Sequence, residues 1–295
     1  MKEILFKGSG VALVTPYDAQ QNINYEELEK LVEFQIENNT DAIIACGTTG
    51  ESSTMTEQEH IDVIQFIIDK VAGRIPVIAG TGSNDTRTAV ELSVHAKKMG
   101  ADGILLITPY YNKTSQKGLI EHYNYIVNEA KLPAIVYNVP SRTGVNILPE
   151  TYLELSKNSY IVATKEANGD AAALAKTISL CGENLNVYSG EDNMTLPIIA
   201  MGGLGVISVF ANALPKQMHD LATASLNGDF TAARKLSNQY LELMDGFFMD
   251  VNPIPIKDAM NRMGFACGPC RMPLTTMPSD KQHKMQALLK KYDLI

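Results

Sequence analysis

The chain has 295 residues, of which 45% are hydrophobic and 20% are charged. This is the composition of an ordinary globular protein, and it excludes a disordered or fibrous chain. The formal net charge of −8 argues against a nucleic-acid-binding protein and against a protein of anionic membrane surfaces, since both need basic patches. The length allows two domains, although a single α/β barrel also reaches this size.

We expect neither a secretory leader nor a membrane span. Lys7, Gly8 and Gly10 interrupt the N-terminal apolar stretch, which therefore predicts a strand. The uncharged stretch 193–215 is long enough to cross a bilayer, but its internal proline and glycines favour a short buried helix followed by a buried strand. The four cysteines are too few for a disulfide framework in a chain of this length, so we expect a cytoplasmic protein with reduced thiols.

Short apolar runs alternate with stretches of helical periodicity, and each run is typical of a parallel strand buried on both faces. In chain order, the first four strands and the helices that follow them are Gly10–Val14 and Tyr25–Ile36, Ala42–Cys46 and a helix opened by the capping-box pattern Thr56–Glu59, Pro76–Ala79 and Thr86–Met99, and Ile104–Ile107 and Gln116–Ala130. The last four are Ala134–Tyr137 and Pro149–Ser156, Ile161–Ala163 and Asp170–Leu180, Val187–Tyr188 and Leu196–Met201, and Val206–Val209 and Pro215–Asn227.

Eight strands that alternate with helices predict a closed parallel sheet, because open doubly wound sheets typically have five or six strands. The predicted fold class is therefore α/β, a (β/α)₈ TIM barrel that occupies residues 1–225. Three further helical segments follow, at Thr231–Met249, Ile254–Met263 and Asp280–Tyr292. They predict a C-terminal helical subdomain over residues 226–295.

Active sites of such barrels lie at the carboxyl ends of the strands, so the polar residues that follow each apolar run are candidates. The second strand is followed by the turn Gly47-Thr48-Thr49-Gly50-Glu51. Its two hydroxyls and free backbone amides can cradle a carboxylate or an oxyanion. The alternative is a turn whose glycines serve only the backbone angles.

Two more strands end in residues that suit an anionic substrate. The fourth is followed by Tyr110 and Tyr111, although paired tyrosines at a strand end often only pack. The fifth ends at Tyr137, and Arg142 follows five residues later. Arginine binds carboxylates through two parallel hydrogen bonds, which makes Arg142 a candidate substrate-binding residue.

The sixth strand carries Lys165 at its carboxyl end. A lysine there is unfavourable unless it is paired, reaches water or loses its proton. The neutral amine is the form that attacks a carbonyl, so Lys165 is a candidate nucleophile. A structural ion pair with Glu166 or Glu191 is the alternative, and the phenols, hydroxyls and arginine at the same end of the barrel favour catalysis.

These motifs resemble the family of pyruvate-dependent class I aldolases that contains dihydrodipicolinate synthase and N-acetylneuraminate lyase. The likeness covers the whole chain and rests on the Gly47–Glu51 turn, on Tyr137-Asn138-Val139-Pro140 and on Lys165-Glu166, in this order. Two features favour the synthase branch, namely the two threonines of the turn and the presence of Arg142.

The resemblance implies a role for each candidate. Lys165 would form a Schiff base with pyruvate, and Tyr137 would donate and accept protons beside it. Thr48 and Tyr111 would complete a proton relay, with Tyr111 reaching in from a neighbouring subunit. Thr49 and backbone groups near Gly190 and Ile207 would fix pyruvate, while Arg142 would hold the carboxylate of L-aspartate 4-semialdehyde.

The same resemblance implies a homo-oligomer, a dimer that usually doubles to a tetramer, and an enzyme that needs no cofactor. Inhibition by lysine at a subunit interface occurs in some members, and Ser52, His60, Asn84 and Tyr110 are plausible parts of such a site. Glu57 and Thr88, however, stand where inhibited enzymes often carry histidine and glutamate. We therefore predict weak lysine inhibition or none.

Two other motifs favour no function of their own. Cys267-Gly268-Pro269-Cys270 copies a thioredoxin tetrapeptide, but no clear helix follows it, so we interpret the cysteines as bystanders. Gly8-x-Gly10 lacks the third glycine of a dinucleotide fingerprint, and we find no metal motif. The alternatives left open are a sibling aldolase for sialic acid or a ketodeoxy sugar acid, and a barrel that only binds a metabolite or senses redox state.

Overall fold

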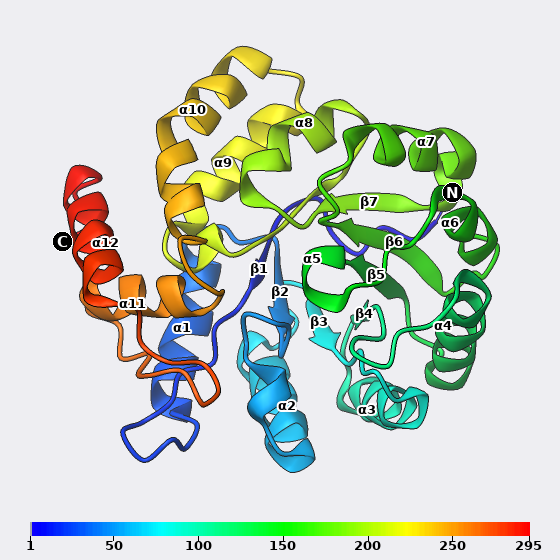
Figure 1. Cartoon of the computed structure of the whole chain (residues 1–295), viewed down its shortest axis with the longest axis horizontal. Coiled ribbons are helices and arrows are strands. Elements are labelled where there is room, and N and C mark those ends of the chain that lie inside the picture. The colour runs from blue at the N-terminus through cyan, green and yellow to red at the C-terminus, as the bar shows by residue number, and fades with distance from the viewer. Residues whose placement is uncertain (1) are drawn as a thin grey trace.

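The computed structural model describes residues 2–295, and its eight parallel strands close into one barrel (Figure 1). The strands are β1 (Gly8–Ala12), β2 (Ala42–Ala45), β3 (Val77–Gly80), β4 (Gly103–Ile107), β5 (Ala134–Asn138), β6 (Ile161–Glu166), β7 (Asn186–Ser189) and β8 (Gly205–Ser208). Each strand pairs with the next along the chain, and β1 pairs with β8 to close the sheet. The predicted TIM barrel is confirmed.

Helices surround the barrel (Figure 1). The helices of the βα repeats are α1 (Tyr25–Glu37), α2 (Glu57–Val71), α3 (Thr86–Met99), α4 (Gln116–Ala130), α5 (Pro140–Thr143), α6 (Pro149–Leu155), α7 (Ala171–Cys181), α8 (Thr195–Ala200) and α9 (Pro215–Leu226). The predicted capping box at the start of α2 is present, because the Thr56 hydroxyl accepts from the Glu59 amide and the Glu59 carboxylate accepts from the Thr56 amide. The four-residue helix α5 was not predicted.

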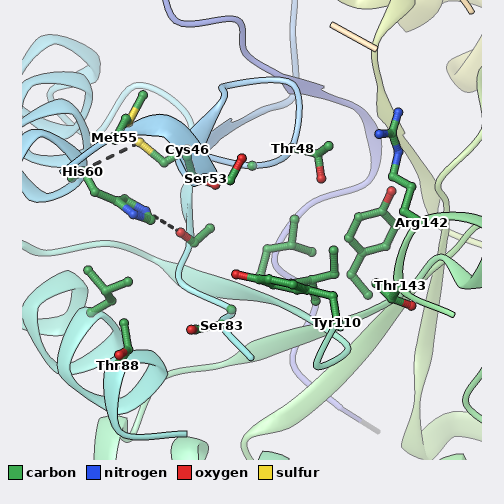
Figure 2. Close-up of a pocket in the computed structure, with 18 of the residues that line it drawn as sticks. Cys46, Thr48, Ser53, Met55, His60, Ser83, Thr88, Tyr110, Arg142 and Thr143 are labelled. Carbon is green, nitrogen blue, oxygen red and sulfur yellow. Dashed lines mark hydrogen bonds between the residues drawn. The ribbon is translucent and has the colours of Figure 1, made fainter. Parts of the chain in front are cut away.

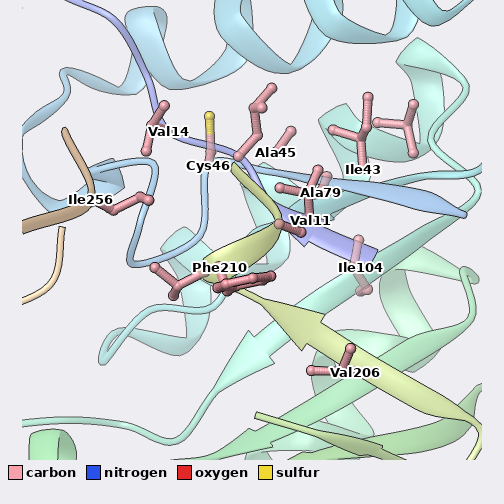
Figure 3. Close-up of a cluster of buried hydrophobic side chains, with 14 of the residues drawn as sticks. Val11, Val14, Ile43, Ala45, Cys46, Ala79, Ile104, Val206, Phe210 and Ile256 are labelled. Atoms are coloured by element: carbon pink, nitrogen blue, oxygen red, sulfur yellow. The ribbon is translucent and has the colours of Figure 1, made fainter. Parts of the chain in front are cut away.

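Alternation along the strands divides the core into two parts. Ala42 and Ile44 of β2 face the inside of the barrel, where they pack with residues such as Leu105 and Tyr137. Ile43 and Ala45 face the surrounding helices instead and belong to the larger apolar layer (Figure 3). Side chains one residue apart therefore lie in different environments, which decides what each polar residue at a strand end can reach.

Three helices follow α9, namely α10 (Phe230–Gly246), α11 (Ile254–Arg262) and α12 (Ser279–Lys291). They lie together on one side of the molecule, where α10 packs on α9 (Figure 1). The predicted C-terminal helices are thus present, while the domain boundary after residue 225 remains a prediction. The uncharged stretch 193–215 forms α8 and β8 as expected, and no helix within residues 2–295 is long and apolar enough to cross a membrane.

Candidate active site

Lys165 lies inside β6 and points into the barrel. It is in register with Tyr137 on β5, and its Nζ lies 4.3 Å from the centre of the Tyr137 ring. The side chain is 6% exposed, and the ion pairs of residues 2–295 do not include it. The strand extends three residues beyond its predicted end at Ala163, so Lys165 belongs to the strand and its amine is enclosed by the barrel.

This enclosure controls the charge of the amine. Burial lowers the pKa of Lys165 from 10.5 to about 7, because the ammonium form loses its hydration. The negative charge of Asp192 opposes this shift, and the positive charge of Arg142 adds to it. A large share of Lys165 is therefore neutral at physiological pH, which is the state that amine nucleophiles need.

Glu166 lies on the other face of the same strand. Its carboxylate accepts hydrogen bonds from the Tyr152 hydroxyl and the Asn138 amide, both at 2.9 Å. Burial raises the pKa of Glu166 to about 7, although these two hydrogen bonds favour the charged form. Among residues 2–295, no ion pair joins Lys165 to Glu166 or Glu191. The structure therefore does not support the alternative that Lys165 is an ion-pair partner.

A cavity of about 160 Å³ opens above Lys165, and we call it the lysine cavity. Six predicted site residues line it, namely Lys165, Tyr137, Thr48, Thr49, Arg142 and Gly190. They come from β6, β5, the turn after β2, α5 and the loop after β7. An amine, a phenol, two hydroxyls and a guanidinium therefore share one space, as expected of residues that follow strand ends.

Arg142 reaches the lysine cavity from α5. The side chain is exposed, and one of its nitrogens donates to the backbone oxygen of Asn252 at 3.5 Å. Since this is a long contact to a single neutral acceptor, most of the guanidinium is available to a ligand. The helix that carries it begins at Pro140, the last residue of the Tyr-Asn-x-Pro motif.

Two predicted site residues lie outside the lining of this cavity. Ile207 is on β8, where it pairs with Gly10 and packs completely buried inside the barrel. Tyr111 is 92% exposed and adopts a left-handed backbone angle, φ +68°. Within a single chain the lysine cavity thus lacks the third member of the expected proton relay.

Two residues of the site were missed in the sequence. Asp192 follows the seventh strand and is fully buried, and one carboxylate oxygen accepts from the backbone amide of Phe210 at 2.9 Å. Its position after an apolar run was a usable signal. Asn252 lines the lysine cavity and donates to the Thr49 hydroxyl at 3.0 Å. It follows no strand of the barrel, so nothing in the local sequence marked it.

A second cavity of about 420 Å³ adjoins the first, and we call it the outer cavity. It shares Thr48, Tyr137 and Arg142 with the lysine cavity. Figure 2 shows Thr48 and Arg142 at one end of it and His60 and Thr88 at the other. Five of the residues that bear on lysine inhibition line it, namely Ser52, Glu57, His60, Thr88 and Tyr110, whereas Asn84 lies outside its lining.

The cysteine pair lies away from both cavities. Cys267 is completely buried, and both Cys267 and Cys270 are free thiols. Burial raises the pKa of each thiol to about 12, so neither is a ready thiolate. The geometry gives the pair no role in the site.

A (β/α)₈ barrel with a buried amine and polar side chains at the carboxyl ends of its strands is the arrangement of an aldolase-type lyase. A family model described as the dihydrodipicolinate synthetase family matches residues 5–292. The chain belongs to this family.

Named relatives agree along the full length. The 4-hydroxy-tetrahydrodipicolinate synthase of Caldicellulosiruptor bescii is 52% identical over 290 residues, which cover 98% of each chain. The crystal structure of dihydrodipicolinate synthase from Aquifex aeolicus matches with a TM-score of 0.96 and 45% identity, over 98% of this chain and 99% of that one. The chloride-inhibited dihydrodipicolinate synthase from Acinetobacter baumannii, solved in complex with pyruvate, matches with a TM-score of 0.96 and 42% identity, over 98% and 99%.

Proposed function

We propose that this chain condenses pyruvate with L-aspartate 4-semialdehyde through a Schiff base on Lys165. The product is 4-hydroxy-tetrahydrodipicolinate, which serves diaminopimelate and lysine biosynthesis. The observation that carries the proposal is the buried Lys165 amine, whose pKa is lowered to about 7, in a cavity that Tyr137, Thr48 and Arg142 also line. The relative from Caldicellulosiruptor bescii bears the name of this activity, and this supports the choice of substrates.

The chemistry begins with the neutral amine. The Lys165 nitrogen attacks the keto carbon of pyruvate, water leaves, and the resulting iminium withdraws electrons so that a methyl proton can be removed. The enamine carbon then forms a bond to the aldehyde carbon of the semialdehyde, whose oxygen takes up a proton and becomes a hydroxyl. The amino group of the same molecule attacks the iminium carbon, which closes the ring and releases Lys165.

Tyr137 and Thr48 suit the proton transfers. Burial raises the pKa of Tyr137 to about 12, so the phenol stays protonated and acts through hydrogen bonds. Tyr137 lies against the Lys165 amine, and Thr48 lines the same cavity. In our proposal Tyr111 of a neighbouring subunit completes this relay, which agrees with its almost full exposure in the single chain.

Substrate binding divides between two parts of the lysine cavity. In our proposal Thr49 and the backbone at Gly190 fix pyruvate within the cavity, and the backbone near Ile207, which lies outside the cavity lining, supports them from below. Arg142 holds the carboxylate of the semialdehyde at the boundary with the outer cavity. The enzyme is then a cytoplasmic homo-oligomer, a dimer of dimers. Within each dimer, every subunit supplies its Tyr111 to the active site of the other.

A sibling aldolase for sialic acid or a ketodeoxy sugar acid is the second candidate. Arg142 in the cavity lining argues against it, since an acidic aldehyde uses a guanidinium and a neutral sugar chain does not. A barrel that only binds a metabolite or senses redox state is the third. The buried thiols and their raised pKa values give no support to a redox role.

The test combines trapping with turnover. Pyruvate and borohydride should leave one reduced pyruvyl adduct on Lys165, which peptide mass spectrometry locates. The enzyme should turn over L-aspartate 4-semialdehyde and leave N-acetylneuraminate untouched. An adduct on another lysine, or none, refutes the Schiff base, while an adduct with turnover of the sugar acid alone assigns the chain to a sibling activity.

A further inference from the structure

The Gly47–Glu51 turn carries Thr48 and Thr49, yet its contacts come from distant parts of the chain. The Thr15 hydroxyl donates to the backbone oxygen of Gly50 at 2.8 Å. From the C-terminal subdomain, Asn252 donates to the Thr49 hydroxyl at 3.0 Å. The turn is therefore held on one side by the loop after β1 and on the other by residues beyond the barrel.

Glu51 closes the turn and is the most deeply buried carboxylate near it. Its backbone is left-handed, with φ +57°, and its side chain is completely shielded from solvent. One carboxylate oxygen accepts from Lys257 Nζ at 2.8 Å, and the other accepts from the backbone amide of Arg271 at 2.9 Å. Both partners belong to the C-terminal subdomain, on α11 and in the loop before α12.

Lys257 has no donor to spare. Besides Glu51, its Nζ donates to the backbone oxygen of Thr15 at 3.0 Å and to that of Pro269 at 2.9 Å. These three acceptors use all three protons of the ammonium group. The Nζ also lies 4.5 Å from the centre of the Tyr17 ring. Since the group is 1% exposed and fully paired, its function is to join segments and not to react.

We infer that Lys257 and Glu51 are positioning residues of the active site, through which the C-terminal subdomain holds the turn that presents Thr48 and Thr49 to the substrates. The Lys257 ammonium joins the loop after β1, the turn after β2 and the loop at Pro269 at one point. A displacement of catalytic groups by about 1 Å can reduce a rate about a hundredfold, so such a joint governs turnover as well as stability.

The decisive variant is Glu51→Gln/Lys257→Met, because it removes both charges and leaves no unpaired ion in the interior. Lys257→Met alone leaves the Glu51 carboxylate unpaired, and Asp258→Asn is the matched control. Asp258 is the next residue on α11 and pairs with Arg262 on the same helix, without contact to the turn. Each protein is measured for turnover, for the borohydride-reduced pyruvate adduct on Lys165, and for hydrogen exchange of residues 47–54.

We expect the double variant to be folded, as a cooperative unfolding transition would show. Its turnover should be at least about tenfold slower than that of the wild type. Exchange at residues 47–54 should rise while β6 stays protected, and Lys165 should still form the adduct. Asp258→Asn should match the wild type in all three measurements. A double variant with turnover within about threefold of the wild type and an unchanged turn overturns the inference.

Failure of both Lys257→Met and the double variant to fold also overturns the inference, because the pair would then serve the whole barrel and not the turn. The inference rests on the proposed function only through the assay. Wild-type enzyme without turnover of L-aspartate 4-semialdehyde refutes the proposed function, whereas active wild type with an equally active double variant refutes the positioning role.

Discussion

The reactivity of Lys165 depends on the face of β6 from which it projects. Thr164 and Glu166, its neighbours, point toward the helices and bond to the Tyr152 hydroxyl. Lys165 points into the barrel, beside Tyr137. A shift of one residue in the register of β6 would exchange these environments and place a carboxylate in the lysine cavity. The chemistry of the site is thus set by strand register at the scale of one side chain.

The lowered pKa of Lys165 predicts how adduct formation depends on pH. Below the pKa of about 7 the amine is protonated, so the rate of pyruvate adduct formation should fall about tenfold per pH unit, and above it the rate should level off. Asp192→Asn removes the charge that raises this pKa, and should move the midpoint to lower pH. Stopped-flow measurement across the pH range checks both statements.

Glu166→Gln is the matched control for that experiment, since Glu166 is next in sequence but faces away from the cavity. Its midpoint should equal that of the wild type. If the rate of adduct formation by the wild type keeps rising until the pH reaches the ordinary lysine pKa of 10.5, the pKa of Lys165 is not lowered and the prediction fails.

Arg142→Leu should raise the KM for L-aspartate 4-semialdehyde and leave the yield of pyruvate adduct unchanged. The loss of a charge-assisted hydrogen bond costs about 1.5–3 kcal/mol, which corresponds to roughly 10- to 150-fold in KM. Steady-state kinetics at a pH above the pKa of Lys165 measures this change in KM. Arg87→Leu, in an exposed side chain on α3, serves as control, and an equal effect of both changes would remove Arg142 from the substrate site.

Lysine should bind weakly in the outer cavity. Thr88 offers no carboxylate for the amino group of the ligand, and burial lowers the pKa of His60, so this ring stays neutral. Titration calorimetry should show no binding at micromolar lysine, and Thr88→Glu should increase the affinity. Micromolar binding of lysine to the wild type would contradict this prediction.

At the scale of elements, helix ends with strong local signals were predicted well. The bounds of α3 and α4 agree with the prediction, because Gly100 ends α3 and Ser115 caps α4 within the local sequence. The four-residue α5 has no periodicity to detect, and so the element that carries Arg142 was missed. Asn252 was missed for another reason, since its contact with Thr49 spans 203 residues.

Closure of the barrel depends on a glycine at the seam between β1 and β8. A Cβ on Gly205 would lie 1.9 Å from the backbone oxygen of Gly8, and the backbone has φ +155°. Gly205→Ala should therefore lower the free energy of unfolding by about 3 kcal/mol or more. Chemical denaturation followed by circular dichroism measures this change.

Gly228→Ala is a control that measures the cost of backbone strain without a steric clash. Gly228 has φ +74°, and a Cβ added to it would meet nothing within 4 Å, so only the left-handed backbone should matter, at about 1–2 kcal/mol. Equal losses for the two variants would mean that the seam relaxes without cost.

At the scale of the whole molecule, one chain holds the proposed nucleophile and its cavity but leaves Tyr111 almost fully exposed. Mixed oligomers test whether this phenol serves a neighbour. Lys165→Ala and Tyr111→Phe subunits should each be poorly active alone. In a random mixture of dimers, about a quarter of the sites should combine an intact lysine with an intact partner tyrosine and recover activity. Activity no greater than the sum of the parents would place Tyr111 outside the relay.

The contacts of Glu51 also bear on the order in which the protein is made. Arg271, which donates to the Glu51 carboxylate, follows it by 220 residues, so the ribosome needs roughly 10 to 40 s to supply this partner. The last barrel strand ends at Ser208, well before that point. A chain that stops after the barrel therefore possesses Lys165 but lacks the partners that hold the turn, and our inference predicts that such a chain turns over slowly until the C-terminal helices are added.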